Sequence, residues 1–459
     1  MQRLFVLAAV CALATTSALA QNQGGGNQGG NQNQGNAGGI LIDARGIVAP
    51  GFVADQSDRL NAKRQRAAAE KSLASDIMSA SPCRKVSLIQ LEAAVAARLA
   101  AEEPISPELA CLAGLQRIDY LFVDPDGKDL IIAGPAEGFA PDQVGRPRGV
   151  ESGRPTLLLD DLLVALRSVP KSSEVGCSID PVPANLAALE RYVAQNSTPA
   201  TPQVIERRYK TMADVLGLHD VRVMGVPEDS HFARSLVEAD YRMKRISIGL
   251  ETPGVKGLRS HLAMLGPGGN SVQRWWFVPL YDGLYRSADR LAFELVGQRV
   301  QLLSQEELTN AAGERSAAAT TRLTTQAFAK QFTERFADLA DQSPVFAELQ
   351  NLFDLCLLAA LIDQEQLAGR VGWSMTVFGD PERLPHRPGP VPRQVPAIVN
   401  SKRASSGVIV GLVGGGVTIQ LRNVLNPAAL QESPTRRLDA VRAEHLGAAR
   451  VPSHRWWWD

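Results

Sequence analysis

The chain has 459 residues, 45% of them hydrophobic, and its 48 basic and 48 acidic residues give a formal net charge of zero. This balance gives no support to binding a polyanion such as nucleic acid over the whole surface. The length and apolar content suffice for one large core or for two or three smaller ones. The sequence therefore predicts a globular body and excludes a chain that is disordered throughout.

The first residues have the pattern of an export signal. Arg3 supplies a positive charge, Leu4 to Leu13 form an apolar run, and Ala18 to Ala20 match the small-x-small pattern that signal peptidases accept. The run is shorter than the roughly 20 residues of a membrane-spanning helix. We predict that residues 1–20 are a cleaved signal peptide and that the protein is exported, periplasmic or secreted, with no transmembrane segment after cleavage. Lipidation at Cys11 is the less favoured alternative.

Residues 21–39 are Gln, Asn and Gly apart from one Ala. This composition cannot bury enough apolar surface to offset chain entropy. We predict a disordered linker, with an end-to-end distance of roughly 25 Å as a flexible coil.

Four cysteines remain after cleavage of the signal: Cys83, Cys111, Cys177 and Cys356. An oxidising compartment permits disulfides, and four cysteines allow three complete pairings. Cys356 lies in an apolar run and is expected to behave as a small buried hydrophobe. The pairing stays open.

Hydrophobic periodicity predicts a mixed α/β (α+β) fold. A partly helical N-terminal extension spans residues 40–84. A first α/β unit follows at residues 85–196. Its expected elements are helices at 88–103, 107–115, 162–167 and 186–194, a β-hairpin formed by 120–123 and 130–133, and strands at 156–159 and 175–179. Asp160 or Asp161 is expected to cap the helix at 162–167.

The cluster of Ser, Thr and Pro at 197–202 marks a boundary. The predicted parts after it are a second α/β unit at 203–310, a helical hairpin at 311–378, a Pro-rich linker at 379–406, a β-hairpin at 407–425 that turns at its three glycines, and a polar tail with a Trp cluster at 426–459. Phenylalanines four residues apart, at 328, 332 and 336, indicate the buried stripe of the helical hairpin.

The helix expected at residues 230–246 has the densest set of functional groups. Phe232, Leu236, Ala239, Met243 and Ile246 form its apolar stripe, flanked by two acid-base pairs at i, i+4 spacing, 238 with 242 and 240 with 244. Two surface ion pairs that frame a core helix explain this pattern without any function.

A catalytic interpretation of the same region joins His231 with Asp240 or Glu228, a base and carboxylates near the positive end of the helix dipole. Ser230 as an N-cap explains the helix start equally well. The sequence contains no H-E-x-x-H, G-x-S-x-G or Walker motif, and its histidines show no metal-ligand spacing. We therefore predict no metal and no cofactor, and we favour a protein without enzymatic activity.

The best binding candidates are aromatic. Trp275, Trp276 and Tyr281 are concentrated in a chain with 5% aromatic residues, and an exposed platform of this kind can stack on sugar rings or a peptide. Arg242 and Lys244 are the cationic candidates. The alternative for the aromatic run is a buried strand with one outward ring.

Several phrases resemble a family of exported proteins of unknown function found chiefly in planctomycete bacteria, domain of unknown function 1598. They extend over roughly residues 85 to 425 and occur at residues 120–125, 132–138, 149–155, 177–181, 239–244 and 344–349. The resemblance implies export, and it implies no activity, cofactor or catalytic residue.

The sequence thus favours a non-catalytic binding or scaffold protein of the cell envelope, whose partner is an envelope protein or polymer and not a nucleic acid. The alternative is an exported hydrolase with a site around His231 and Asp240. The missing motifs favour the first, and the sequence leaves the partner, substrate and oligomeric state open.

Overall fold

The computed structural model describes residues 39–42, 48–51, 59–196, 198, 200–266, 271–309, 315–317, 321–404, 407–420, 424–425, 429–447 and 455–459. The predicted signal peptide, with Cys11, and the linker up to residue 38 lie outside these residues. They stay predictions.

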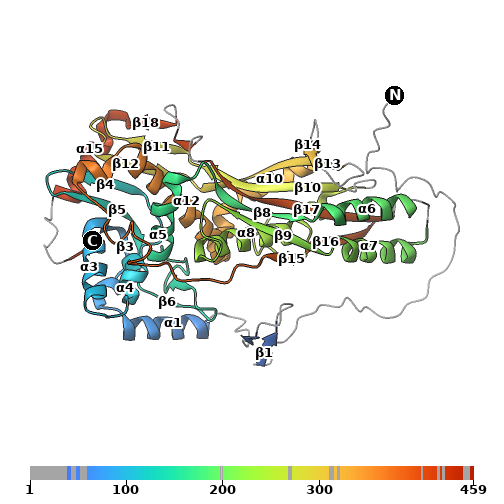
Figure 1. Ribbon diagram of the computed structural model, residues 1–459, viewed down its shortest axis with the longest axis horizontal. Coiled ribbons are helices and arrows are strands. Elements are labelled where there is room, and N and C mark those ends of the chain that lie inside the picture. Colours follow the sequence, from blue (N-terminus) through green and yellow to red (C-terminus); the bar gives the residue numbers. More distant parts are fainter. Residues whose placement is uncertain are drawn as a thin grey trace.

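Two large sheets and the helices packed on them give a mixed α/β fold, as predicted (Figure 1). Figure 1 shows one sheet on the left and the other on the right, with helix α12 (Pro344–Gln364) between them. Two small antiparallel pairs complete the strands, β1 (Gly39–Ile42) with β2 (Val48–Gly51) and β6 (Phe139–Pro141) with β7 (Pro147–Gly149).

The first large sheet has seven strands, and its neighbours come from distant parts of the chain. Their order is β18 (Leu430–Glu432), β11 (Gly283–Arg286), β12 (Ala292–Val296), β4 (Tyr120–Asp124), β5 (Asp129–Ala136), β3 (Ser81–Ser87) and β19 (Trp457–Trp458).

The second large sheet has eight strands. Its order is β14 (Arg315–Ala317), β13 (Arg299–Thr309), β10 (Ser271–Leu280), β17 (Gly407–Ile419), β8 (Val175–Pro181), β9 (Leu218–Met224) and β15 (Gln394–Pro396), while β16 (Val399–Ala404) also pairs with β17. β8 belongs to the first predicted unit and β9 to the second, so the two units share a sheet.

The helices before residue 250 are α1 (Arg59–Ser72), α2 (Ser75–Met78), α3 (Leu88–Ala100), α4 (Pro107–Ala110), α5 (Leu159–Ser168), α6 (Pro183–Gln195), α7 (Pro202–Leu216) and α8 (His231–Ser247). Those after it are α9 (His261–Met264), α10 (Leu323–Glu334), α11 (Phe336–Gln342), α12, α13 (Leu367–Val371) and α15 (Arg437–Gly447). Short 3-10 turns lie at Leu112–Gly114, Val169–Lys171 and Pro434–Arg436.

Helix α12 is the centre of the core. It packs against α5, α8, α11 and β13, and its residues from Val345 to Ala359 are all buried. Its length and apolar composition would also suit a membrane span, but it is wholly enclosed by the rest of the fold. We therefore interpret it as the core helix that joins the two sheets.

Local signals account for the elements that were predicted well. Ser230 caps α8 by accepting a hydrogen bond from the backbone N–H of Ala233 at 3.1 Å, and the predicted apolar stripe of this helix is buried. In the hairpin of β4 and β5, Asp124 accepts a hydrogen bond from the N–H of Gly127 at 2.9 Å and closes the turn.

The strand predicted at residues 156–159 is wrong. Helix α5 begins at Leu159, after an N-cap residue, Leu158, whose side chain makes no capping hydrogen bond. Asp160 and Asp161 lie in the first turn of the helix, where carboxylates interact favourably with the dipole.

The β-hairpin predicted at residues 407–425 is also wrong, because β17 is one continuous strand between β10 and β8. A Cβ atom on Gly415 would lie 1.7 Å from the carbonyl oxygen of Trp275, and one on Gly416 would lie 2.1 Å from that of Cys177. These two glycines therefore permit close backbone approach within a strand. Residues 421–423 and 426–428 lie outside the described part.

The Pro-rich segment and the polar tail differ from what the sequence suggested. The segment at 379–406 contributes β15 and β16, and the guanidinium of Arg167 donates to the carbonyls of Asp380 and Leu384 at 3.3 and 2.8 Å. The tail at 426–459 supplies β18, α15 and β19. Sequence composition underestimated both, since their buried contacts come from residues far away in the chain.

The four cysteines of the described part, Cys83, Cys111, Cys177 and Cys356, are free thiols. Cys356 is fully buried in α12, as expected, and burial raises the pKa of the Cys111 thiol to about 12. These side chains contribute as small hydrophobic groups.

Candidate functional site

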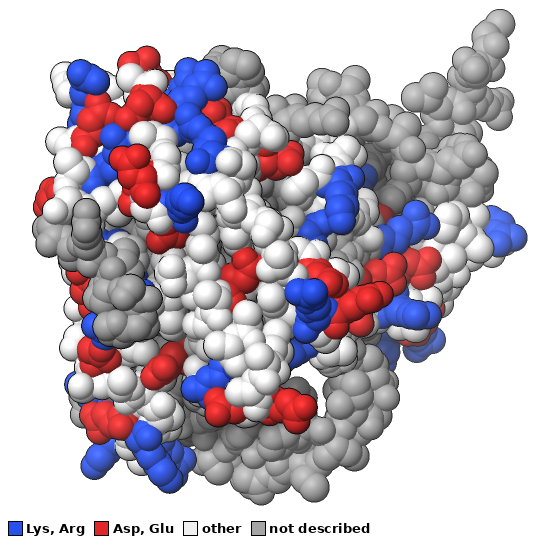
Figure 2. Space-filling model, turned by 60° about the vertical axis from the view of Figure 1, so that its left-hand side comes forward, with Lys and Arg blue, Asp and Glu red and all other residues white. Residues whose placement is uncertain are grey.

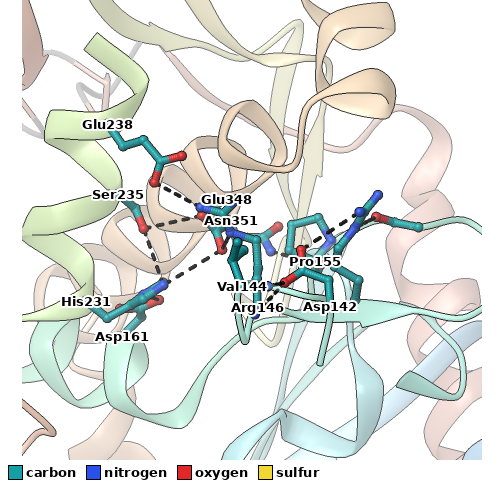
Figure 3. Close-up of polar contacts among 12 residues, drawn as sticks. Asp142, Val144, Arg146, Pro155, Asp161, His231, Ser235, Glu238, Glu348 and Asn351 are labelled. Atoms are coloured by element: carbon teal, nitrogen blue, oxygen red, sulfur yellow. Dashed lines mark hydrogen bonds and ion pairs between the residues drawn. The ribbon is translucent and has the colours of Figure 1, made fainter. Parts of the chain in front are cut away.

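His231, the first residue of α8, lies in a polar cluster that α5, α8 and α12 build together (Figure 3). Its Nδ1 is 2.9 Å from the Oδ2 of Asp161, which α5 presents. Its Nε2 faces the Oγ of Ser235 at 3.5 Å and the Oε1 of Glu348 at 3.8 Å. The carboxylate of Asp161 favours the tautomer with the proton on Nδ1 when the ring is neutral.

The cluster continues to Arg146, in the loop between β6 and β7 (Figure 3). Its Nε lies 2.7 Å from the Oε1 of Glu348, and its Nη2 lies 3.0 Å from the Oε2 of Glu238. The hydroxyl of Ser235 donates to the second oxygen of Glu348 at 3.4 Å. Glu348 therefore connects the cation of the loop with the imidazole and the hydroxyl of α8.

Burial and charge act together on this cluster. Burial alone would lower the pKa of His231, but the charge and hydrogen bond of Asp161 and the charge of Glu348 outweigh it and raise that pKa. Burial also raises the pKa of Glu348, against the charges of Arg146 and His231. Both pKa values are therefore shifted toward retention of the proton.

The order carboxylate, imidazole, hydroxyl is the one that nucleophilic hydrolases use. Here, however, Ser235 is only 1% exposed and its hydroxyl donates to Glu348. A nucleophile has to reach the substrate, and this hydroxyl is enclosed within the fold. The arrangement as it stands serves better to join three helices than to attack a bond.

The structure does not bring the predicted partners of His231 to it. Asp240 lies nine residues along α8, about 13 Å along the axis, and its Oδ2 contacts the ammonium of Lys244 at 2.7 Å. Glu228 is exposed and lines a separate pocket of about 430 Å³ with Asp229. The imidazole contacts Asp161 instead.

Lys244, predicted as a cationic binding residue, is 1% exposed. Besides Asp240, its ammonium donates to the carbonyls of Ile179 and Gly415 at 3.2 and 3.1 Å, on β8 and β17. Burial raises the pKa of Asp240 to about 6 against the lowering effect of Lys244. The predicted surface pair is thus an internal one that attaches α8 to the second sheet.

Arg242, the other cationic candidate, contacts Glu251 through Nη2 at 2.6 Å. Glu238, which the sequence placed opposite Arg242 at i, i+4 spacing, pairs with Arg146 instead. Both side chains of that predicted pair therefore have partners outside α8.

The aromatic candidates separate according to the alternation of strand β10. Trp275 is fully buried, its ring centroid is 4.9 Å from that of Phe328, and its Nε1 donates to the carbonyl of Thr325 at 3.4 Å. Trp276 points to the opposite face, as neighbouring strand residues do, and is half-buried. Only Trp276 of this pair is placed to meet a ligand.

A groove of about 530 Å³ lies beside Trp276, where the second sheet meets the first. Its apolar lining includes Trp276, Val278, Tyr281 and Leu303, and its polar lining includes Asp282, Thr418, Gln420 and Gln431. The hydroxyl of Tyr281 donates to the buried Asp354 at 3.2 Å, which fixes the orientation of its ring. The groove thus combines two aromatic rings, of which Tyr281 is held by a hydrogen bond, with hydroxyl, amide and carboxylate groups.

Within the described residues, no group of three or more His, Cys, Asp and Glu side chains is arranged to hold a metal ion. The carboxylates beside His231 are occupied by His231, Ser235 and Arg146.

Comparison with known protein families gives a match for one part of the chain. Residues 177–261 match a family model described as "Protein of unknown function (DUF1598)". The matched residues run from β8 to the start of α9 and include His231, Ser235 and Lys244, but not Asp161, Glu348 or Trp276. No curated protein and no solved structure matches the chain.

Sequence reasoning missed Asp161, Glu348 and Arg146. Asp161 was interpreted as a helix cap, and the loop of Arg146 has no periodic pattern. One signal was present: Glu348 is an acid within a long apolar helix, and buried acids need partners.

Proposed function

We propose that the protein is a non-catalytic binding protein of the cell envelope, and that the groove beside Trp276 holds the sugar rings of a neutral or weakly charged envelope glycan. The observation that carries this proposal is the meeting of Trp276 and Tyr281 with several hydrogen-bonding side chains in one groove. The export signal expected from the sequence supplies the location.

The chemistry of the groove favours a sugar over other ligands. The apolar face of a pyranose ring packs on an aromatic ring, while its hydroxyls need donors and acceptors at the edge. Trp276 offers such a ring, and Asp282, Gln431 and Thr418 lie around it. A polyanion is disfavoured because the lining contains a carboxylate and the chain carries no net charge.

The charge distribution agrees with this choice. On the face drawn in Figure 2, basic and acidic residues are interspersed, and a broad uncharged area occupies its middle. Surfaces that bind polyanions instead concentrate one sign of charge.

The test is binding of the purified mature chain to isolated envelope glycan, measured by co-sedimentation and by the change in Trp fluorescence. We expect saturable binding that Trp276→Ala weakens at least about tenfold, the effect of losing one stacking platform of about 1.4 kcal/mol. Two leucine variants serve as a matched pair. Leu303→Ala changes the groove and should weaken binding, whereas Leu323→Ala removes an 82% exposed leucine outside the groove and should not. Equal binding by all variants would contradict the proposal.

A second candidate is an exported hydrolase, favoured by one observation, the alignment of Asp161, His231 and Ser235. In this mechanism the Oγ of Ser235 attacks a carbonyl carbon while His231 accepts its proton, and Asp161 orients the ring. The site would have to open, because Ser235 is buried. Asp240, nine residues along α8 from His231, has no part in this alignment.

The hydrolase candidate has a direct test. A serine-reactive fluorophosphonate should label wild-type protein at Ser235, and His231→Ala should abolish the labelling. Asp240→Ala, which removes the carboxylate that the sequence paired with His231, is the comparison. Absence of labelling, together with no turnover of peptide, ester or glycan substrates by folded wild-type protein, would eliminate this candidate.

A further inference from the structure

The edge of the first sheet is formed by a short strand from a distant part of the sequence, residues Arg455–Asp459, which we call the Trp segment. Its strand β19 pairs with β3, Trp457 opposite Val86 and Trp458 opposite Lys85. The backbone N–H of Ser87 also donates to the carbonyl of Trp456 at 2.9 Å. Without the Trp segment, β3 would present an open edge, the kind of surface that accepts strands from other chains.

Arg84 of β3 is built to receive the acidic end of this segment. Its side chain is fully buried, and its Nε and Nη2 donate to the two carboxylate oxygens of Asp459 at 2.9 and 3.0 Å. Its other hydrogen bonds go to backbone carbonyls, among them that of Ala113 at 2.7 Å. Asp459 is the one carboxylate that contacts Arg84 within the described residues. A buried guanidinium needs such a partner.

The two buried tryptophans of the segment are recognised on opposite faces of the strand. The ring of Trp457 contacts the guanidinium groups of Arg84 and Arg455, whose Cζ atoms lie 4.6 and 4.3 Å from its centroid. Trp458 packs into a separate apolar cluster with Phe122 and Leu438. Each ring brings roughly 150–250 Å² of surface into contact. Successive residues of the segment therefore meet different and specific surroundings.

We propose that the edge of β3 with Arg84 is a recognition site for a strand of the type aromatic, aromatic, acid, and that the Trp segment of a second copy of this chain occupies it when two copies meet. The contacts of the segment with β3, Arg84 and the Phe122 cluster are the same whichever copy supplies it, so exchange retains these contacts. This inference is independent of the groove beside Trp276.

The segment of the same chain competes with that of a second copy. Only residues 448–454 separate the segment from α15. A connection of this length gives the segment an effective concentration on the order of mM, so the intact chain forms exchanged pairs only where copies are crowded. Two complementary full-length variants remove this competition. An acceptor carries Trp457→Ala with Trp458→Ala and retains Arg84, while a donor carries Arg84→Met and retains its Trp segment.

Mixing acceptor and donor tests the proposal. We expect a one-to-one complex in native mass spectrometry and light scattering, whereas each variant alone stays monomeric. The matched control is an acceptor that also carries Arg84→Met, which should not bind the donor. A mixture of folded variants that stays monomeric would overturn the proposal.

Folding of the variants is part of the test. If the donor does not fold, a labelled peptide with the sequence Arg-Trp-Trp-Trp-Asp replaces it, and its binding to the acceptor should weaken at least tenfold when the last residue is Arg. If the acceptor does not fold, the proposal is also overturned, because an exchangeable strand must leave a folded recognition site behind.

Discussion

The cluster around His231 and the groove beside Trp276 both hold residue types that catalysis and binding use, but they present them differently. In the cluster, Asp161, Ser235 and Glu348 are at most 5% exposed and contact one another or a cation. In the groove, Trp276 is half-buried and lines the groove wall. Functional potential depends less on residue type than on whether a side chain's partners are already inside the protein.

The largest expected effect comes from removing Glu348. Glu348→Ala leaves Arg146, whose side chain is only 10% exposed, without its closest partner and leaves His231 with one carboxylate, so we expect a loss of about 3–5 kcal/mol in the free energy of unfolding, measured by urea denaturation. Glu238→Ala removes the more exposed partner of the same arginine and should cost at most about 1 kcal/mol. Equal losses in the two variants would show that the polar cluster around His231 does not hold the helices together through Glu348.

Asp240→Ala should cost a similar amount, about 3–5 kcal/mol, because it leaves the buried ammonium of Lys244 without a counter-charge. The same denaturation experiment measures it, with Glu251→Ala as the milder comparison, because Glu251 and its partner Arg242 are 19% and 32% exposed. An Asp240→Ala protein as stable as the wild type would contradict the role of this pair in attaching α8 to the sheet.

A substitution in the groove should change ligand binding more than stability. We expect Trp276→Ala to lower the free energy of unfolding by only about 1 kcal/mol, because the ring is half-buried, while glycan binding falls at least about tenfold. Titration calorimetry and thermal melts on one preparation measure both quantities. A large loss of stability with unchanged affinity would assign Trp276 to the core.

The smallest expected effect is on the pH dependence of stability. The folded pKa values of His231 and Glu348 are raised above 6.5 and 4.5, so the folded state binds the extra protons. The stability that these groups contribute is fully present below those unfolded values and is lost as pH rises through the folded ones. The slope is at most about 1.4 kcal/mol per pH unit for each group.

His231→Gln should reduce this slope between pH 6 and 8, about the range in which a histidine titrates. Urea denaturation at several pH values measures it, with His386→Gln, a partly exposed histidine that pairs with the exposed Asp229, as the control. A wild-type stability that rises through this range, or a slope unchanged in His231→Gln, would contradict the assigned protonation.

The predictable part of the fold rests on local patterns. The cap at Ser230, the turn at Asp124 and the apolar stripe of α8 are written in neighbouring residues, so sequence alone found them. The pairing of β8 with β9 and β17, and the continuous strand through Gly415, depend on contacts between distant residues. Three glycines in an apolar run fit a turn as well as a close approach of strands, and the sequence cannot separate these possibilities.

The candidate sites follow the same rule. His231 and Trp276 were found because other polar or aromatic residues adjoin them in the sequence. Asp161 and Glu348 reach His231 from helices 70 and 117 positions away. The pairing of Lys244 with Asp240 was predicted, but not its burial, because the carbonyls of Ile179 and Gly415 that it contacts belong to other strands. Burial of polar groups is a property of the assembled fold.

The central claim is that the protein binds through the groove while the His231 cluster is structural. The most direct measurement is the affinity of Trp276→Ala and Ser235→Ala for envelope glycan, side by side with the wild type. The account predicts that Ser235→Ala binds like the wild type and that Trp276→Ala loses at least about tenfold in affinity. Full affinity in Trp276→Ala, with binding or turnover lost in Ser235→Ala, would contradict it.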